Sequence, residues 1–511
     1  MNTDRTILHG VFGSVVLTAA SIAASFVQFR LLVHALPESV VGLWFLFLSI
    51  GGYLLFFDLG LSPTLGREIS FCLGDTSLSE SARAERIGNL IRSCLVAFAA
   101  IAAVLLVAGT SAGWAYLGTV TPKPILSQVR LAWGIFVVGT AFSIVGEVWL
   151  AALYGLGQVA TEKLVRSIGP ILWLILTMVA LRTGRGLPGL AVAWVVQLVV
   201  TRLIARGTLG RLKPGIISSG KFDFALIRQL AAPSMKFAAI MLGGILILQT
   251  DNLVIASMLG TAEIPGYQAV AKLVTVMMSL SMMLVATSAP FLSRAHVMQD
   301  VTEIKRLLNR NLRFSLSIMA VISCFLACFA DRIVAMWIGP HHFVGFGVVW
   351  ALILVMLLEG HHSAMATATM ATGDIPFVAP ALIAGVLNIV ASVLLARQYG
   401  LLGVALGTLC AQVVTNNWYV PFYTMRLFHI SFSEHFATVL LPLGKLFVAL
   451  LLTSVGARVA FRTLSNVPAI MAAGTLVLAV GFIAFRLFVL NSSERVHFME
   501  ALRQSLRRND A

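Results

Sequence analysis

Charged side chains inside long apolar stretches are the residues of this sequence whose types could do chemistry. Three are carboxylates, Asp58, Glu147 and Asp251, and two are cations, Arg30 and Lys272. An ionisable group at mid-bilayer costs at least about 2.5 kcal/mol, so such groups face a polar cavity, a partner or a ligand. A buried carboxylate can take up a proton, and a buried cation can bind an anionic group. We therefore predict ion coupling at the carboxylates and anion binding at the cations.

Structural alternatives stay open for all five positions. Arg30 lies near the end of its apolar stretch, from which a long side chain can reach the interface. Asp251 and Lys272 fall on consecutive predicted helices across a short turn, where they could form an ion pair. Asp58 and Glu147 could instead hydrogen-bond to a neighbouring helix.

A third polar set lies near one end of a later apolar stretch. Glu359, His361 and His362 are close together in sequence. Their side chains could relay protons, or they could simply be in contact with water. We favour the second interpretation, because the set lies near the predicted inner end of its helix.

The composition defines the kind of element that must position these residues. The chain has 511 residues, of which 59% are hydrophobic and only 11% charged, and its mean hydropathy is +0.94. So few charges could not cover a soluble protein of this size, which indicates a membrane protein with many spans. Apolar run lengths predict about 14 helices. Their centres are near Leu17, Ser49, Ala102, Gly139, Leu174, Val195, Leu246, Met278, Ile318, Leu354, Val386, Gly407, Leu450 and Val480.

Two sequence echoes indicate that the chain contains two similar halves. Ser62–Arg67 (Ser-Pro-Thr-Leu-Gly-Arg) and Ala289–Arg294 (Ala-Pro-Phe-Leu-Ser-Arg) share the pattern Pro-x-Leu-x-Arg. Leu187-Pro-Gly189 with Gln197–Thr201 is echoed in the same way around residues 401–415. The echoes lie roughly 210–230 residues apart, which is the offset expected of an internal repeat in a transporter.

The repeat also sets the predicted domain boundaries. We expect a six-helix lobe at 1–206, a cytoplasmic linker with an interfacial amphipathic helix at 207–232, a second six-helix lobe at 233–426, extra helices 13 and 14 at 427–490, and a cytoplasmic amphipathic tail at 491–511. The predicted fold class is therefore an all-α polytopic membrane protein. It has two pseudo-symmetric six-helix lobes and two additional C-terminal helices.

The distribution of Lys and Arg predicts the orientation. With the N-terminus inside, the inside links and ends carry about 25 basic residues and the outside links about 8, a strong positive-inside bias. An even number of spans then places both termini in the cytoplasm. This bias also accounts for the net charge of +15, so we do not expect nucleic acid as a partner. The tail opens with a predicted helix capping box, Asn491-Ser-Ser-Glu494.

The sequence lacks the motifs that would indicate a metal site, ATP binding or catalysis. The five cysteines lie mostly in apolar stretches, and the pair Cys324 and Cys328 has no neighbouring ligands to complete a metal site. The sequence has no Walker A, HExxH or GxSxG motif, and no external link is long enough for a catalytic domain. We therefore predict neither a metal nor a cofactor, and a transporter rather than an enzyme.

Three groups of residues carry a resemblance to a known family. They are Gly42-Leu-Trp through Asp58-Leu-Gly-Leu, Gln249–Ile255 followed by Gly266-Tyr267, and the series Gly373, Asn388 and Tyr399–Gly403. In these segments the sequence resembles the polysaccharide (O-antigen, Wzx-type) lipid-linked oligosaccharide flippases. That family belongs to the superfamily that also holds the MATE exporters and the lipid II flippases.

The resemblance implies a function and a set of partners. It implies a bacterial inner-membrane flippase that moves undecaprenyl-pyrophosphate-linked oligosaccharide by alternating access, for O-antigen, capsule or exopolysaccharide. Membrane lipids are expected partners, as are glycosyltransferases and a polysaccharide polymerase. In this picture Arg30 and Lys272 bind the headgroup, and Arg67 and Arg294 lie at the inner gate, although positive-inside anchoring explains the last two nearly as well.

Three alternatives remain open. A MATE-like ion-coupled exporter of small cations would share the fold, but it would need a net acidic cavity, whereas the outer positions here include Arg30 and Lys272. A membrane enzyme of polysaccharide synthesis would need a catalytic loop that the sequence lacks. A structural scaffold for polysaccharide assembly would tolerate neutralisation of the intramembrane charges.

Overall fold

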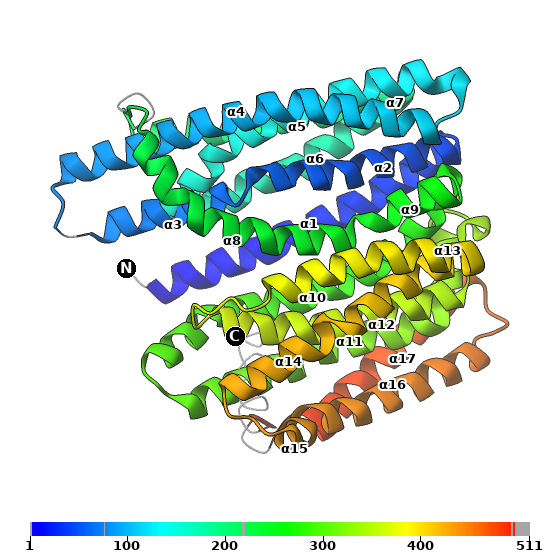
Figure 1. Cartoon of the computed structure of the whole chain (residues 1–511). Helices are drawn as coiled ribbons and strands as arrows, with labels where there is room; N and C mark the ends of the chain where they lie inside the picture. The colour runs from blue at the N-terminus through cyan, green and yellow to red at the C-terminus, as the bar shows by residue number, and fades with distance from the viewer. Residues whose placement is uncertain (1–2, 76, 217–219, 492–493, 496–511) are drawn as a thin grey trace, which may run out of the picture. The chain divides into compact units, whose positions relative to one another are not determined.

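The structure is a computed structural model that describes residues 3–75, 77–216, 220–491 and 494–495 (Figure 1). These residues form long helices joined by short links, and there is no strand in the ranges just given. Apolar runs of this length form helices in a membrane because a helix satisfies its own backbone hydrogen bonds. The predicted all-α class is confirmed.

The chain divides into two compact units, Met1–Pro265 and Gly266–Ala511. The helices of the first unit are α1 (Thr3–Ala35), α2 (Glu38–Leu55), η1 (Phe56–Asp58), α3 (Leu61–Gly74), α4 (Glu80–Val120), η2 (Lys123–Ile125), α5 (Leu126–Gly155), α6 (Val159–Arg182), α7 (Gly186–Leu212), α8 (Phe224–Leu248), α9 (Thr250–Met258) and η3 (Thr261–Glu263). Helix α10 (Ile264–Val297) begins at the boundary.

The second unit continues from α10. Its remaining helices are α11 (Val301–Trp337), η4 (Pro340–His342), α12 (Phe346–Met370), α13 (Val378–Val414), α14 (Asn416–Leu427), α15 (Phe432–His435), the π-helical turn η5 (Phe436–Leu440), α16 (Leu441–Ala460), α17 (Asn466–Ala484) and the π-helical turn η6 (Phe485–Val489). The predicted domain boundaries rest on a sequence repeat and not on compactness, so they stay a prediction.

Twelve helical segments within the described residues are long and apolar enough to cross a membrane. The predicted number of 14 is not confirmed, for two reasons. In α1, only Ala19–Ala35 counts, as a shorter apolar helix. Val378–Leu427 counts as one segment of 50 residues, although Gly400 (φ 56°, ψ −133°) interrupts its helical geometry.

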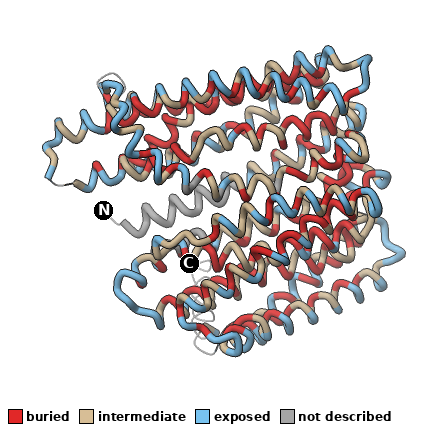
Figure 2. The backbone as a smooth tube through the Cα atoms, in the orientation of Figure 1, coloured by how far each residue is buried: buried red, intermediate tan, exposed pale blue. Residues whose placement is uncertain are grey.

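Exposed residues occur along the helices of both units (Figure 2), and many of them are large and apolar. Val107 of α4 is 71% exposed, Ile175 of α6 53% and Leu478 of α17 64%. In a soluble protein such surfaces would promote aggregation, whereas in a membrane they face hydrocarbon. The protein is a multi-pass membrane protein.

Helix α5 is the centre of the first unit. It packs against α7 and α4 and is the most buried of the twelve spans. One part of its length carries an aromatic cluster, in which Phe136 stacks on Trp133 at 5.5 Å and on Trp194 at 5.8 Å between ring centroids. A Cβ on Gly113 of α4 would lie 2.0 Å from Nε1 of Trp133, so only glycine allows this close approach.

Helix α11 has the corresponding place in the second unit. It packs against α12, α16 and α17. Asp331 of α11 accepts two hydrogen bonds from Arg458 of α16, at 2.9 and 2.6 Å. Of the last two spans, predicted as extra helices, α16 is therefore held to α11 by a bidentate ion pair as well as by packing, and α17 packs against α11.

The predicted linker at 207–232 overlaps the ends of two long helices. Helix α7 continues to Leu212, and α8 runs without interruption from Phe224 through Pro233. The expected interfacial helix is therefore the first part of the long helix α8 and not a separate helix. The backbone N–H groups of Lys221 and Asp223 donate to Asn89 Oδ1 (2.7 Å) and Ser93 Oγ (2.8 Å) of α4.

The start of the C-terminal tail agrees with its prediction. The backbone N–H of Glu494 donates to Asn491 Oδ1 at 2.8 Å, and the N–H of Asn491 donates to Glu494 Oε2 at 2.9 Å. This reciprocal pair confirms the predicted capping box. The rest of the predicted amphipathic tail, 496–511, lies outside the described residues.

Candidate functional site

Asp58 lies where the second long apolar helix breaks. Helix α2 is followed by the short turn η1, and then Leu59 (φ 51°) and Gly60 (φ 71°) take the left-handed conformation before α3 begins. Oδ1 of Asp58 accepts hydrogen bonds from the backbone N–H and the hydroxyl of Ser62, at 3.1 and 3.0 Å. The carboxylate thereby satisfies one of the backbone donors that a helix N-terminus leaves without an intrahelical partner.

Glu147 of α5 lies in a different environment, between two arginines. Its Oε2 accepts from Nη2 of Arg202 of α7 at 2.8 Å, and its Oε1 accepts from Nη2 of Arg166 of α6. Arg166 also donates from Nε to Glu162, and Arg202 donates to the hydroxyl of Ser143 at 2.8 Å. We name Glu147, Glu162, Arg166 and Arg202 the α5–α7 charge cluster.

The α5–α7 charge cluster is balanced, and three of its four members are largely buried. It contains two carboxylates and two guanidiniums. The side-chain exposures of Glu162, Arg202 and Glu147 are 8%, 13% and 18%, whereas that of Arg166 is 46%. In such surroundings each charge depends on its partner, because removing one member leaves another buried charge uncompensated. Glu147 therefore joins α5 to α6 and to α7 through charged hydrogen bonds.

Three members of this cluster were not identified from the sequence. Arg166 and Arg202 were counted as basic residues of inside links, and Glu162 was not singled out. The spacing of Glu162 and Arg166, four residues apart on one helix, could have indicated their pairing. The contact between Glu147 and Arg202 has no local signal, because it depends on which faces of α5 and α7 meet.

The segment that contains Asp251 also follows a helix break. Helix α8 ends at Leu248, Gln249 lies between the two helices, and α9 begins at Thr250. The side chain of Asn252 donates to Ser49 of α2 at 2.8 Å, and Thr250 shares a hydrogen bond of 2.5 Å with Tyr53. Asp251 lies half-buried in the same first turn of α9.

The four cations predicted to bind substrate lie on three helices. Arg30 is exposed in the last two turns of α1, and Arg67 of α3 lies over the ring of Phe71, with Cζ 5.8 Å from its centroid. Lys272 is half-buried in α10, and Arg294 is exposed in the last turn of the same helix. The first unit thus holds Arg30 and Arg67, and the second holds Lys272 and Arg294.

The histidine set of the second unit has partners. Glu359 accepts from the Ser363 hydroxyl at 3.0 Å and lies 3.2 Å from Nδ1 of His362. The Nε2 atoms of His361 and of His435 of α15 are 3.0 Å apart. His435 was not identified from the sequence, because it lies in a link after α14. The set is a polar contact between α12 and α15.

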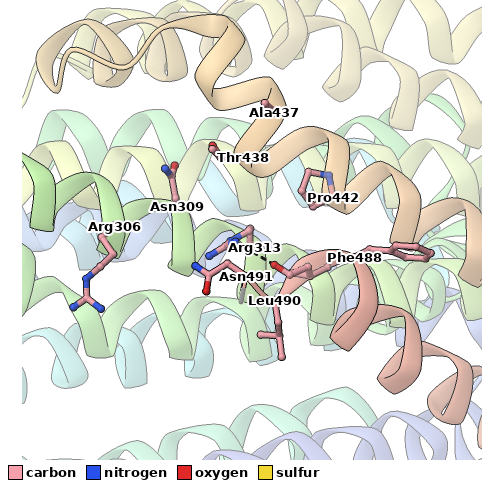
Figure 3. Close-up of a pocket in the computed structure, with 10 residues that line it drawn as sticks. Arg306, Asn309, Arg313, Ala437, Thr438, Pro442, Phe488, Leu490 and Asn491 are labelled. Atoms are coloured by element: carbon pink, nitrogen blue, oxygen red, sulfur yellow. Dashed lines mark hydrogen bonds between the residues drawn. The ribbon is translucent and has the colours of Figure 1, made fainter. Parts of the chain in front are cut away.

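A pocket of about 380 Å³ lies in the second unit where both π-helical turns approach α11 (Figure 3). Its charged lining comes from α11, with Arg306 and Arg313, and its apolar lining includes Phe488. Arg313 donates to Glu494 at 2.7 Å and to the backbone carbonyl of Val489 at 3.1 Å. Single-turn π-helices often occur at functional sites.

A second pocket of the same unit is almost wholly apolar. It has a volume of about 350 Å³ and lies between α10, α11, α16 and α17. Leu284, Phe314, Ile318, Leu446 and Phe482 are among its lining residues. Such a cavity can accommodate part of a hydrocarbon chain.

A sequence comparison with models of known protein families identifies the family of this chain. The model described as "Polysaccharide biosynthesis protein" matches residues 89–345, which is half of the chain. The chain belongs to the polysaccharide biosynthesis protein family. The predicted family is thereby confirmed. No curated protein sequence matches the chain.

Solved structures agree on the fold of this polysaccharide biosynthesis protein. It is similar to the lipid II flippase MurJ in an inward closed conformation, with a TM-score of 0.66 and 13% identity over 93% of this chain and 98% of that chain. An inward-facing multidrug resistance MATE transporter of the MOP superfamily gives a TM-score of 0.65 and 14% identity over 82% and 99%. A MOP superfamily transporter from Pyrococcus furiosus gives 0.57 and 14% over 82% and 94%.

These identities show the fold and not the cargo. The MATE-like fold class predicted from the sequence is confirmed. The chain thus shares its fold with a lipid flippase and with MATE transporters, which agrees with the prediction of a transporter rather than an enzyme.

Proposed function

We propose that this protein is a flippase that moves undecaprenyl-pyrophosphate-linked oligosaccharide across the bacterial inner membrane by alternating access. The product would enter O-antigen, capsule or exopolysaccharide biosynthesis. The protein has both termini in the cytoplasm and works beside glycosyltransferases and a polysaccharide polymerase. Its cargo joins an anionic diphosphate and a polar glycan to a long hydrocarbon chain.

The observation that carries the proposal is how much of the chain each fold comparison covers. The lipid II flippase matches 93% of this chain, whereas the MATE transporter matches 82%. The family match to polysaccharide biosynthesis points in the same direction. Both favour a lipid-linked cargo over the small cations that an exporter would carry.

The second unit offers surfaces for both parts of such a cargo. Lys272 supplies a half-buried cation within the span Thr261–Val285. The apolar pocket beside α16 and α17 provides a place for part of a prenyl chain. We assign Arg30, Lys272, Arg67 and Arg294 to substrate binding, because a cation compensates the diphosphate in a low-dielectric medium.

Helix breaks supply points at which the units can change shape. They lie at Leu59–Gly60, at Gln249 and at Gly400. Broken helices in transporters commonly lie at the substrate and ion sites. Of the three carboxylates predicted to couple ions, we assign the role first to Asp58, since its carboxylate is bonded by neutral groups, and next to Asp251. Glu147 is the last candidate, because two arginines bond to it. We propose protons rather than sodium as the coupling ion.

The test is complementation of a strain that lacks its own polysaccharide flippase and makes a matched glycan. The parent chain should restore surface glycan. Lys272→Ala should reduce it at least about tenfold, which is the rate effect of losing about 1.4 kcal/mol in binding or translocation. Lys445→Ala is the matched control, because Lys445 is an exposed lysine of a membrane helix in the same unit. Arg30→Ala, Arg67→Ala and Arg294→Ala complete the series.

Blots of membrane fractions must show equal amounts of every variant. Restoration by the parent and by Lys445→Ala, but not by Lys272→Ala, supports both the function and the site. Restoration by all variants would keep the function and remove the assigned residues. Failure of the parent chain, combined with resistance to toxic organic cations on expression, would replace the flippase with an exporter.

A further inference from the structure

The first unit contains a basic pocket that none of the assigned transport residues line. It has a volume of about 470 Å³ and lies between α4, α5 and α7. Three arginines contribute to its lining, Arg92 of α4 and Arg202 and Arg206 of α7. All of its lining residues belong to this one unit.

The three arginines differ in how their charges are compensated. Arg202 is bonded to Glu147 at 2.8 Å within the α5–α7 charge cluster. Arg92 and Arg206 are exposed, and neither forms an ion pair within the part of the chain that the structure describes. The guanidinium of Arg206 lies over the ring of Trp149, with Cζ 5.8 Å from its centroid, which holds that arginine at the pocket wall. The pocket is therefore positive and attracts an anion.

The charge pattern along the helices indicates the depth of the pocket in the membrane. On α4 a long stretch without charged residues begins directly after Arg92. On α7 such a stretch ends directly before Arg202, and on α5 one ends directly before Glu147. The hydrocarbon core accommodates stretches without charge, whereas arginines at their ends lie at headgroup level. The pocket therefore lies where phospholipid phosphates are found.

Apolar side chains adjoin the arginines on the side of the uncharged stretches. Phe142 of α5 is 40% exposed and Leu203 of α7 is 52% exposed, and both line the pocket. Leu95 of α4 adds a third apolar group, one helical turn from Arg92. A free phosphate ion would gain nothing from these groups, but a molecule with a phosphate and hydrocarbon chains would contact both kinds of surface.

We propose that this pocket binds one anionic phospholipid of the surrounding bilayer. Arg92 and Arg206 contact its phosphate, and its acyl chains lie against Phe142 and Leu203. The ligand is a resident lipid and not the cargo, because a transported headgroup must be released when the two units move, whereas this pocket lies within one unit. The site is thus additional to the proposed transport function and does not depend on it.

Native mass spectrometry of the purified full-length protein can test the proposal. The protein would be titrated with phosphatidylglycerol, with zwitterionic phosphatidylcholine as the comparison lipid. The parent should retain one phosphatidylglycerol at least tenfold more tightly than phosphatidylcholine. In Arg92→Gln/Arg206→Gln that affinity should fall about 25-fold, since each basic residue near an anionic surface contributes about 1 kcal/mol, or about fivefold.

Arg211→Gln/Lys213→Gln is the matched control. It removes the same charge from exposed positions at the end of α7 that do not line the pocket, so affinity should change less than twofold. Should the double pocket variant fail to fold, Arg92→Gln and Arg206→Gln alone, each about fivefold weaker, provide the same test.

Four results would overturn the proposal. The first is equal retention of the two lipids by the parent. The second is equal weakening in the pocket and control variants, which would indicate general surface charge. The third is displacement of phosphatidylglycerol by millimolar inorganic phosphate, which would indicate a free-anion site. The fourth is one-for-one displacement by a smaller amount of undecaprenyl diphosphate, which would indicate a cargo site.

Discussion

Asp58 and Glu147 are both carboxylates on apolar helices of the first unit, and their surroundings differ in the partners that they offer. Asp58 accepts from the backbone and hydroxyl of Ser62, at 3.1 and 3.0 Å, which are neutral donors. Glu147 accepts from the guanidiniums of Arg166 and Arg202. One carboxylate lies at a helix break, and the other joins three continuous helices.

The difference separates two roles that a membrane carboxylate can have. A protonated Asp58 keeps a carbonyl oxygen for the Ser62 N–H and can donate its proton to the Ser62 hydroxyl, so both charge states have partners. Loss of the negative charge at Glu147 would leave the buried Arg202 without its counter-charge, whereas Arg166 is 46% exposed and also bonds to Glu162. The comparison therefore favours Asp58 over Glu147 for the proton uptake that we propose, and it gives Glu147 the role of joining α5, α6 and α7.

Glu147→Gln should have the largest effect on stability. The amide retains the shape of the side chain but removes the charge that compensates Arg166 and Arg202. We expect a loss of about 3 kcal/mol in the free energy of unfolding, the typical cost of breaking a buried ion pair by removing one partner. Thermal unfolding in detergent, followed by loss of the monodisperse peak in size-exclusion chromatography, would measure it.

The double variant Glu147→Gln/Arg202→Gln is the control for this interpretation. It removes one positive charge together with the negative charge, so it should recover part of the stability that Glu147→Gln loses. A Glu147→Gln variant as stable as the parent would show that the α5–α7 charge cluster does not hold these helices together, and the comparison with Asp58 would fail.

The sequence predicted these two carboxylates but could not distinguish between them. The cost of an isolated charge in an apolar run is a local property, so Asp58 and Glu147 were both identified from single stretches. Helix positions were predicted for the same reason, since a span is defined by its own length and hydropathy. The helix break at Gly60 also had a local signal, in Gly60 and Pro63.

Contacts between distant helices had no such signal. Arg202 lies 55 residues after Glu147 and was interpreted as a basic residue of a link, because the positive-inside pattern alone accounts for it. Which faces of α5 and α7 meet depends on side-chain packing along both helices, including the stack of Phe136 on Trp194. One sequence does not determine this packing, so the α5–α7 charge cluster emerged only from the structure.

Asp58→Asn should have a smaller effect on stability and a clear effect on transport. The amide oxygen can still accept from Ser62, so we expect a loss of about 1 kcal/mol, the difference between a charged and a neutral acceptor. In proteoliposomes, transport by the parent should rise when a proton gradient is imposed in the driving direction. The variant should transport at one rate with and without the gradient.

A control gradient and two possible outcomes define how this transport result is interpreted. A sodium gradient serves as the control, and it should leave the parent and the variant unchanged. If Asp58→Asn still responds to the proton gradient, the coupling group lies elsewhere, and Asp251 becomes the next residue to test. If the parent responds to neither gradient, the coupling roles of all three carboxylates are withdrawn.

Glu303→Gln should have the smallest effect, and it separates the contribution of burial from that of geometry. Glu303 and Arg306 of α11 form two hydrogen bonds of 2.6 Å, a geometry as good as any in the α5–α7 charge cluster. Their side chains, however, are 34% and 62% exposed. Water and mobile ions therefore compete for both charges, and we expect a loss of about 0.3 kcal/mol, measured as for Glu147→Gln. A loss of about 3 kcal/mol here would mean that bidentate geometry alone stabilises an ion pair. The burial of Glu147 and Arg202 would then not explain why Glu147→Gln is expected to cost more stability than Asp58→Asn.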